Sequence, residues 1–120
     1  MLLYVEDNLA NLALIRRILS GHPGIRILTA MQGGIGLRLA HEYHPDLILL
    51  DSHLPDMHGE DVLRRLQSDA ASRSIPVIML SADASPGQIQ RLLSNGARNY
   101  LTKPLDVRKF LQIVEETLGP

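Results

Sequence analysis

Short apolar runs that each lead to a polar residue are the feature that most constrains this chain. Uninterrupted apolar runs of four residues or fewer suit strands that are buried on both faces, as in parallel sheets. The carboxyl ends of parallel strands meet at one edge of the sheet, where open α/β sheets bind ligands. We therefore expect the polar residues to converge on one crevice. The runs are 2–5, 47–50, 77–80 and 100–101, and the polar residues behind them are Glu6 with Asp7, Asp51, Ser81 and Lys103.

Three carboxylates in one crevice repel one another and need a divalent cation. Oxygen ligands of this kind suit Mg²⁺, which usually combines one or two carboxylates with water and phosphate oxygens. The Ser81 hydroxyl and the Lys103 ammonium are groups that hold phosphate oxygens. The residues themselves therefore indicate metal-assisted phosphoryl chemistry.

Stretches with helical spacing separate the apolar runs. Strands that alternate with helices require parallel pairing through right-handed crossovers. We therefore predict one doubly wound, three-layer α/β domain over residues 1–120. The expected strands are 2–5, 25–29, one from Asp46, one from Pro76, and 99–101. The expected helices are one capped by Asn8 and ended by Gly21, one from Gly33 that ends before His44, one through 62–66, one from Ser85-Pro86 to Gly96, and one through 107–118.

Charge and composition argue against several classes of function. With 12 basic and 13 acidic residues the formal net charge is −1, so neither nucleic acid nor an anionic membrane is an expected partner. No apolar stretch approaches a membrane span, and Met1 to Val5 is too short for a signal peptide. The absence of cysteine fits a reducing compartment, so we expect the cytoplasm. A chain that opens directly on a strand suits a domain cut from a longer protein and equally a free-standing one.

In order and spacing these residues resemble the receiver domains of two-component response regulators, from about Leu2 to Leu118. The resemblance implies a five-stranded parallel sheet in the order 2-1-3-4-5, which is the flavodoxin-like arrangement. Residues 4–8 and the close of the domain at Leu118 are also similar to receivers fused behind hybrid histidine kinases. The matching pieces are Glu6-Asp7-Asn8, residues 49–59, Ser81-Ala82, Gly96-Ala97 and residues 100–104.

The resemblance implies a phosphoacceptor and a metal site. Asp51 would be the nucleophile that takes the phosphoryl group and forms an acyl phosphate. Asp7 and Asp51 would bind Mg²⁺ directly, with Mn²⁺ able to substitute. The backbone carbonyl of His53 would add a third oxygen, and Glu6 would act through metal-bound water. Lys103 would hold a phosphoryl oxygen.

The resemblance also implies a switch. A hydrogen bond from Ser81 to the phosphoryl group would draw in the loop after the fourth strand and let Tyr100 turn inward. The face formed by the fourth helix, fifth strand and fifth helix would then change. The side chains of His53 and Asp83 would set the lifetime of the phosphoryl group. Pro104 fits a cis peptide bond that would aim Lys103 inward.

The implied phosphodonor is a histidine kinase or a histidine phosphotransfer protein. The implied reader is a downstream effector or a fused kinase module, and a phosphorylation-dependent homodimer is a further implied partner. Neither direct contact with nucleic acid nor insertion into a membrane is expected. In this interpretation the chain is a signalling phosphoacceptor that acts only on itself, and not an enzyme with separate substrates.

Other interpretations stay open. Ser81 can be a turn cap, and Tyr100 a half-buried strand aromatic that does not move. We favour solvated loop histidines over a transition-metal site at His53 and His58. The glycines at 33, 34 and 36 suit a flexible helix start better than a phosphate loop, because they lack the spacing and lysine of one.

Two other functions compete with the signalling interpretation. A Mg²⁺-dependent phosphohydrolase would use the same nucleophile, although such enzymes commonly carry an acid where His53 stands. A degenerate receiver that only docks to partners is the other, and the acids together with Lys103 argue against it.

Overall fold

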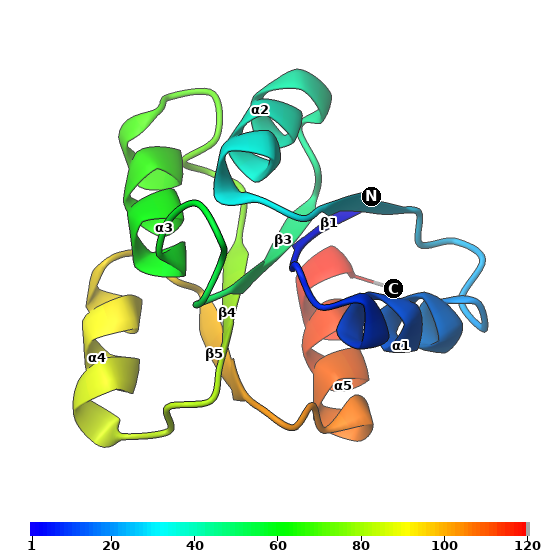
Figure 1. Cartoon of the computed structure of the whole chain (residues 1–120). Helices are drawn as coiled ribbons and strands as arrows, with labels where there is room; N and C mark the ends of the chain where they lie inside the picture. Colours follow the sequence, from blue (N-terminus) through cyan, green and yellow to red (C-terminus); the bar gives the residue numbers. More distant parts are fainter. Residues whose placement is uncertain (120) are drawn as a thin grey trace.

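Five parallel strands form one sheet in the order β2-β1-β3-β4-β5, and a helix follows each strand along the chain (Figure 1). The computed structural model describes residues 1–119, and Pro120, the last residue of the expected domain, lies outside the described residues. The strands are β1 (Leu2–Val5), β2 (Ile27–Ala30), β3 (Leu47–Asp51), β4 (Val77–Ser81) and β5 (Asn99–Thr102). The helices are α1 (Leu9–Leu19), α2 (Gly33–Tyr43), α3 (Gly59–Ser68), α4 (Pro86–Ser94) and α5 (Val107–Leu118). This architecture confirms the predicted fold class and strand order.

The strands are apolar on both faces because helices cover both sides of the sheet. Helices α1 and α5 lie on one face, and α2, α3 and α4 lie on the other (Figure 1). In β1, Leu3 and Val5 belong to the core under α2 and α3, whereas Leu2 and Tyr4 belong to the core under α1 and α5. Because β1, β3, β4 and β5 run parallel, the polar residues behind their carboxyl ends share one edge of the sheet. Within residues 1–119 no helix has the length and apolarity to cross a membrane.

Strand β2 starts later than predicted. The amide of Ile25 donates to the carbonyl of His22 in the turn after α1, so the ladder begins at Ile27. At its other end β2 extends to Ala30, which pairs with Val5. Strand β1 has the predicted bounds, and four further limits differ from the predicted ones by one or two residues: β3 begins at Leu47, β4 begins at Val77, α4 ends at Ser94 and β5 ends at Thr102.

A distant loop caps the amino end of α2. Gln32 occupies the N-cap position but makes no side-chain cap bond. Instead the carboxylate of Asp56, in the loop between β3 and α3, accepts from the amides of Gly33 (2.7 Å) and Gly34 (2.9 Å). These bonds from Gly34 and Gly33 lower the pKa of Asp56. The glycine run is therefore a helix start, as predicted, and not a phosphate loop. The Asp56 carboxylate already binds its first amides.

Helix α3 begins without a side-chain cap, and this allows a stability prediction. His58 holds the N-cap position with extended backbone angles but makes no cap hydrogen bond. Because serine at this position can accept from a free amide of the first turn, His58→Ser should stabilise the fold by about 1 kcal/mol. That gain corresponds to a rise of roughly 4 °C in the midpoint of thermal unfolding. His58→Ala is the matched control, and equal midpoints for the two variants would contradict the prediction.

Candidate functional site

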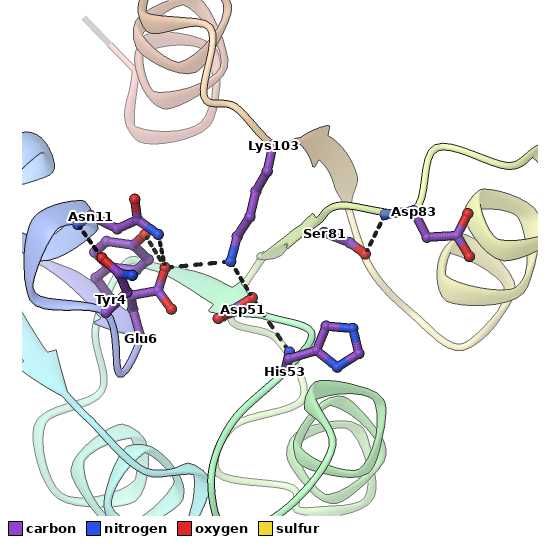
Figure 2. Close-up of polar contacts among 9 residues, drawn as sticks. Tyr4, Glu6, Asn11, Asp51, His53, Ser81, Asp83 and Lys103 are labelled. Carbon is purple, nitrogen blue, oxygen red and sulfur yellow. Dashed lines mark hydrogen bonds and ion pairs between the residues drawn. The ribbon is translucent and has the colours of Figure 1, made fainter.

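Asp51 is the last residue of β3, the central strand, and is only 2 % exposed. Its Oδ1 lies 3.0 Å from Nζ of Lys103 and accepts a long bond of 3.4 Å from the amide of His53 (Figure 2). The start of α3 packs directly behind it, because a Cβ at Gly59 would lie 2.2 Å from the Asp51 carbonyl oxygen. Glycine at this position thus lets the start of α3 pack closely against the backbone of Asp51 and Ser52.

Glu6 follows β1 and is fully buried on the same edge of the sheet. Its Oε1 accepts from the hydroxyl of Tyr4 (3.1 Å) and from Nδ2 of Asn11 (2.7 Å), and lies 3.7 Å from Nζ of Lys103 (Figure 2). Its Oε2 is buried without a hydrogen-bond partner. Burial, followed by the adjacent carboxylate of Asp51, raises the pKa of Glu6.

The three acids come together as expected. Glu6, Asp7 and Asp51 each offer a carboxylate oxygen, and these oxygens lie within 4.8 Å of one another. Asp7 is exposed and leaves this group open to solvent. A buried carboxylate oxygen without a partner, next to further carboxylates, fits a hard cation with oxygen ligands. The donor set of this structure therefore suits Mg²⁺.

Lys103 reaches the acids from the loop after β5 (Figure 2). Its peptide bond to Pro104 is cis, the form expected for it. Partial burial disfavours the charged ammonium, but the hydrogen bond and attraction to Asp51 and the attraction to Glu6 outweigh it, so the pKa of Lys103 is raised. The side chain therefore stays charged at neutral pH and acts as a cation among the carboxylates.

Ser81 and Tyr100 are both tied to Asp83, in the loop after β4. The Oγ of Ser81 accepts from the amide of Asp83 (3.1 Å), and the hydroxyl of Tyr100 donates to the carbonyl of Asp83. The Asp83 carboxylate accepts from the amide of Ser85 (2.9 Å), which lowers the pKa of Asp83. Tyr100 is buried and not half-buried. The hydrogen bond from its hydroxyl joins β5 to this loop.

The imidazole rings of the two loop histidines are not part of the acid group. His53 and His58 are exposed and pair with each other through a short antiparallel bridge of their backbones. Among residues 1–119, the group of Glu6, Asp7 and Asp51 is the one set of three such ligands that lies close enough for a metal. The geometry thus agrees with the view of these histidines as solvated loop residues.

Comparison with known proteins gives one family. Residues 2–115 match the sequence profile of the response regulator receiver domain. The chain belongs to this family. It is also 38% identical over 117 residues to the polar-differentiation response regulator DivK of Brucella ovis, covering 96% of this chain and 93% of DivK.

Solved structures of receivers have the same fold. The receiver domain of the sensor histidine kinase PA1611 from Pseudomonas aeruginosa is 30% identical with a TM-score of 0.87, covering 99% of this chain and 97% of that one. That crystal structure has a magnesium ion coordinated in its active-site cleft. A CheY-like receiver domain protein from Methanospirillum hungatei is also 30% identical at a TM-score of 0.87, covering 98% of this chain and 91% of that one. The chain is thus a receiver domain of two-component systems with the flavodoxin-like fold.

Two residues of this receiver site were not predicted, namely Tyr4 and Asn11. Tyr4 lies two residues before Glu6, and the alternation of a strand places both on one face. Asn11 lies in the first turn of α1, where its backbone amide donates to the side chain of the cap residue Asn8 (3.0 Å). The spacing was therefore available as a signal, but a tyrosine in an apolar strand and an asparagine in an amphipathic helix are common structural residues.

Glu6→Gln should stabilise the receiver without metal. Because burial raises the pKa of Glu6 above its ordinary value of 4.5, the stability that the neutral form contributes is complete below 4.5 and is lost as pH rises through the folded-state pKa. Glutamine keeps a neutral side chain that can donate to Asp51. At neutral pH we expect a gain of about 1 kcal/mol in the free energy of unfolding.

Thermal unfolding with a chelator, from about pH 4 to about pH 8, measures this difference. The two curves should separate as pH rises, and added Mg²⁺ should stabilise the wild type more than the variant. Curves that stay parallel over this range would contradict the prediction.

Proposed function

We propose that this receiver, as one module of residues 1–120, accepts a phosphoryl group from a phosphohistidine donor onto Asp51 with the help of Mg²⁺. The observation that carries the proposal is the setting of the Asp51 carboxylate. It is buried at a strand end, 3.0 Å from the Lys103 ammonium and within reach of the carboxylates of Glu6 and Asp7. A nucleophile, a cation for phosphate and a set of metal ligands thus occur in one crevice.

The cation would bind to the acid edge of the sheet. Asp7 and Asp51 would hold it directly, together with the backbone carbonyl of His53, and Glu6 would act through a bound water. When bound, Mg²⁺ neutralises the charge that builds up as a phosphate dianion meets carboxylates, and Mn²⁺ would substitute.

The transfer itself is a displacement at phosphorus. A carboxylate oxygen of Asp51 forms the new bond to phosphorus while the bond to the imidazole nitrogen of the donor breaks. The electron pair stays on that nitrogen, which then takes up a proton. Lys103 pairs with a phosphoryl oxygen. Water later cleaves the acyl phosphate and releases inorganic phosphate, so the domain returns to its starting state and acts only on itself.

The signal would leave through the loop after β4. The Ser81 hydroxyl accepts from Asp83 and still has a proton to donate to the phosphoryl group. If Ser81 turns toward that group, the Asp83 loop follows, and Tyr100 is bonded to the same loop. The face of α4, β5 and α5 would then shift toward a second arrangement. The exposed side chains of His53 and Asp83 would set the access of water and hence the lifetime.

The partners follow from this chemistry. A histidine kinase or a histidine phosphotransfer protein would supply the phosphoryl group, in the cytoplasm where ATP feeds such donors. A downstream effector, a fused kinase module or a second phosphorylated copy would bind the changed face.

Incubation with acetyl phosphate and Mg²⁺ tests the proposal. Intact-mass spectrometry should detect one added phosphoryl group per chain, and peptide analysis should assign it to Asp51. A chelator should prevent the addition. A label on another residue, or sustained turnover of a chromogenic phosphate ester, would contradict the proposal, the latter in favour of a phosphohydrolase.

A further inference from the structure

The carboxylate of Glu6 is held from one side only. Its Oε1 receives hydrogen bonds from Tyr4 (3.1 Å) and Asn11 (2.7 Å), whereas its Oε2 is equally buried but receives none. A buried carboxylate whose only task is structural would gain from a partner on each oxygen, because an unpaired buried acceptor costs stability. The asymmetry therefore needs an explanation beyond packing.

Both donors are themselves fixed. Tyr4 is 1 % exposed in the middle of the β1 ladder, so its ring cannot move away without disturbing the core under α1 and α5. Asn11 lies in the first turn of α1, and its backbone amide donates to the side chain of the cap residue Asn8. One donor thus comes from the sheet and the other from a helix, and together they fix the carboxylate plane of Glu6.

Glu6 belongs to the group of acids that could hold a metal ion. Glu6 contributes a carboxylate oxygen to the set that Asp7 and Asp51 complete within 4.8 Å. With Oε1 engaged by Tyr4 and Asn11, Oε2 is the oxygen left for a cation or its water. Mg²⁺ requires near-ideal octahedral geometry, so the direction of each ligand matters more than for larger cations.

We propose that Tyr4 and Asn11 are positioning residues for the metal site: they hold Oε1 of Glu6 so that Oε2 faces the cation. This inference rests on the proposed function, which places Mg²⁺ at these acids. Neither residue touches the metal or the phosphoryl group, and both act through Glu6. Partners of this kind, one step removed from the metal, commonly change metal affinity by about tenfold or more when they are replaced.

Mg²⁺ binding to the full chain tests the inference without any phosphodonor. Titration with MgCl₂, followed by calorimetry or by backbone NMR shifts, gives the dissociation constants of wild type, Tyr4→Phe and Asn11→Ala. We expect each variant to bind Mg²⁺ about tenfold more weakly and to lose part of the preference for Mg²⁺ over Ca²⁺. Tyr43→Phe and Asn95→Ala are matched controls, since Tyr43 is exposed on α2 and the amide of Asn95 donates to Glu60 on α3.

The same substitutions in a Glu6→Gln background separate positioning from packing. If Tyr4 and Asn11 act through Glu6, neither should change the Mg²⁺ affinity further in that background. Wild-type affinity in both single variants, even with lower melting temperatures, would overturn the inference and leave the proposed function standing. A wild-type chain that binds no Mg²⁺ would overturn both. Should Tyr4→Phe fail to fold, Asn11→Ala decides the matter, because its side chain is only partly buried.

Discussion

Phosphorylation should disappear when Asp51 is replaced by asparagine. The amide of asparagine is not a nucleophile for phosphorus, and the change also removes one of the three carboxylates grouped at the site. We expect the rate of labelling by acetyl phosphate to fall by at least about a thousandfold, since loss of a covalent nucleophile is among the largest single effects in such chemistry. Intact-mass spectrometry of the two proteins under the same conditions measures it.

Asp61→Asn is the control for this substitution. Asp61 lies in the first turn of α3, where its carboxylate pairs with Arg64 and takes no part in the acid group. This variant should be labelled like the wild type. NMR spectra with beryllofluoride and Mg²⁺ should show shifts near Ser81 and Tyr100 in the control and none in Asp51→Asn. Labelling of Asp51→Asn at the wild-type rate would show that another residue accepts the phosphoryl group.

Lys103→Ala should be almost as damaging to phosphorylation but not to metal binding. The ammonium of Lys103 lies 3.0 Å from Asp51 and 3.7 Å from Glu6, so it is placed to pair with a phosphoryl group that Asp51 receives. Loss of one positioned donor to developing charge typically lowers a rate by about a hundredfold or more. We expect a reduction of this size in the rate of labelling by acetyl phosphate.

Titration with Mg²⁺ separates metal binding from phosphorylation at this site. Because Lys103 is itself a cation among the carboxylates, its removal should preserve Mg²⁺ binding or strengthen it. Lys109→Ala is the natural control, since Lys109 is exposed on α5 and the chain has no third lysine. Normal labelling of Lys103→Ala, or a loss of Mg²⁺ binding equal to its loss of labelling, would contradict this assignment.

The predictable part of the site follows from strand geometry. Leu2–Val5 and residues 47–50 are apolar because helices cover both faces of the sheet, so their sequence alone indicates buried parallel strands. Parallel strands end at a common edge, which brings together residues as distant in sequence as Glu6, Asp51 and Lys103. Their convergence therefore needed no knowledge of side-chain contacts.

Contacts between distant segments cannot be predicted from strand geometry. Tyr4 has the ordinary features of a core residue, and only its contact with the Glu6 carboxylate gives it a second role. The hydroxyl of Tyr100 donates to the backbone of Asp83 in another loop, a contact that its place in β5 does not reveal. The start of β2 depends on a turn bond from Ile25, which competes locally with strand pairing. In each case a tertiary or turn contact, and not an intrinsic preference of the residue, decides the outcome.

The cap that Asp56 provides for α2 has a consequence for hydrogen exchange. The two amides that it binds are 22 and 23 residues away in the sequence, so these two hydrogen bonds link the start of α2 to the loop between β3 and α3. A fluctuation that opens this loop frees the amides of Gly33 and Gly34 at the same moment. These amides and those of the loop should therefore exchange with deuterium as a single cooperative unit. The start of α2 should fray whenever the loop between β3 and α3 opens.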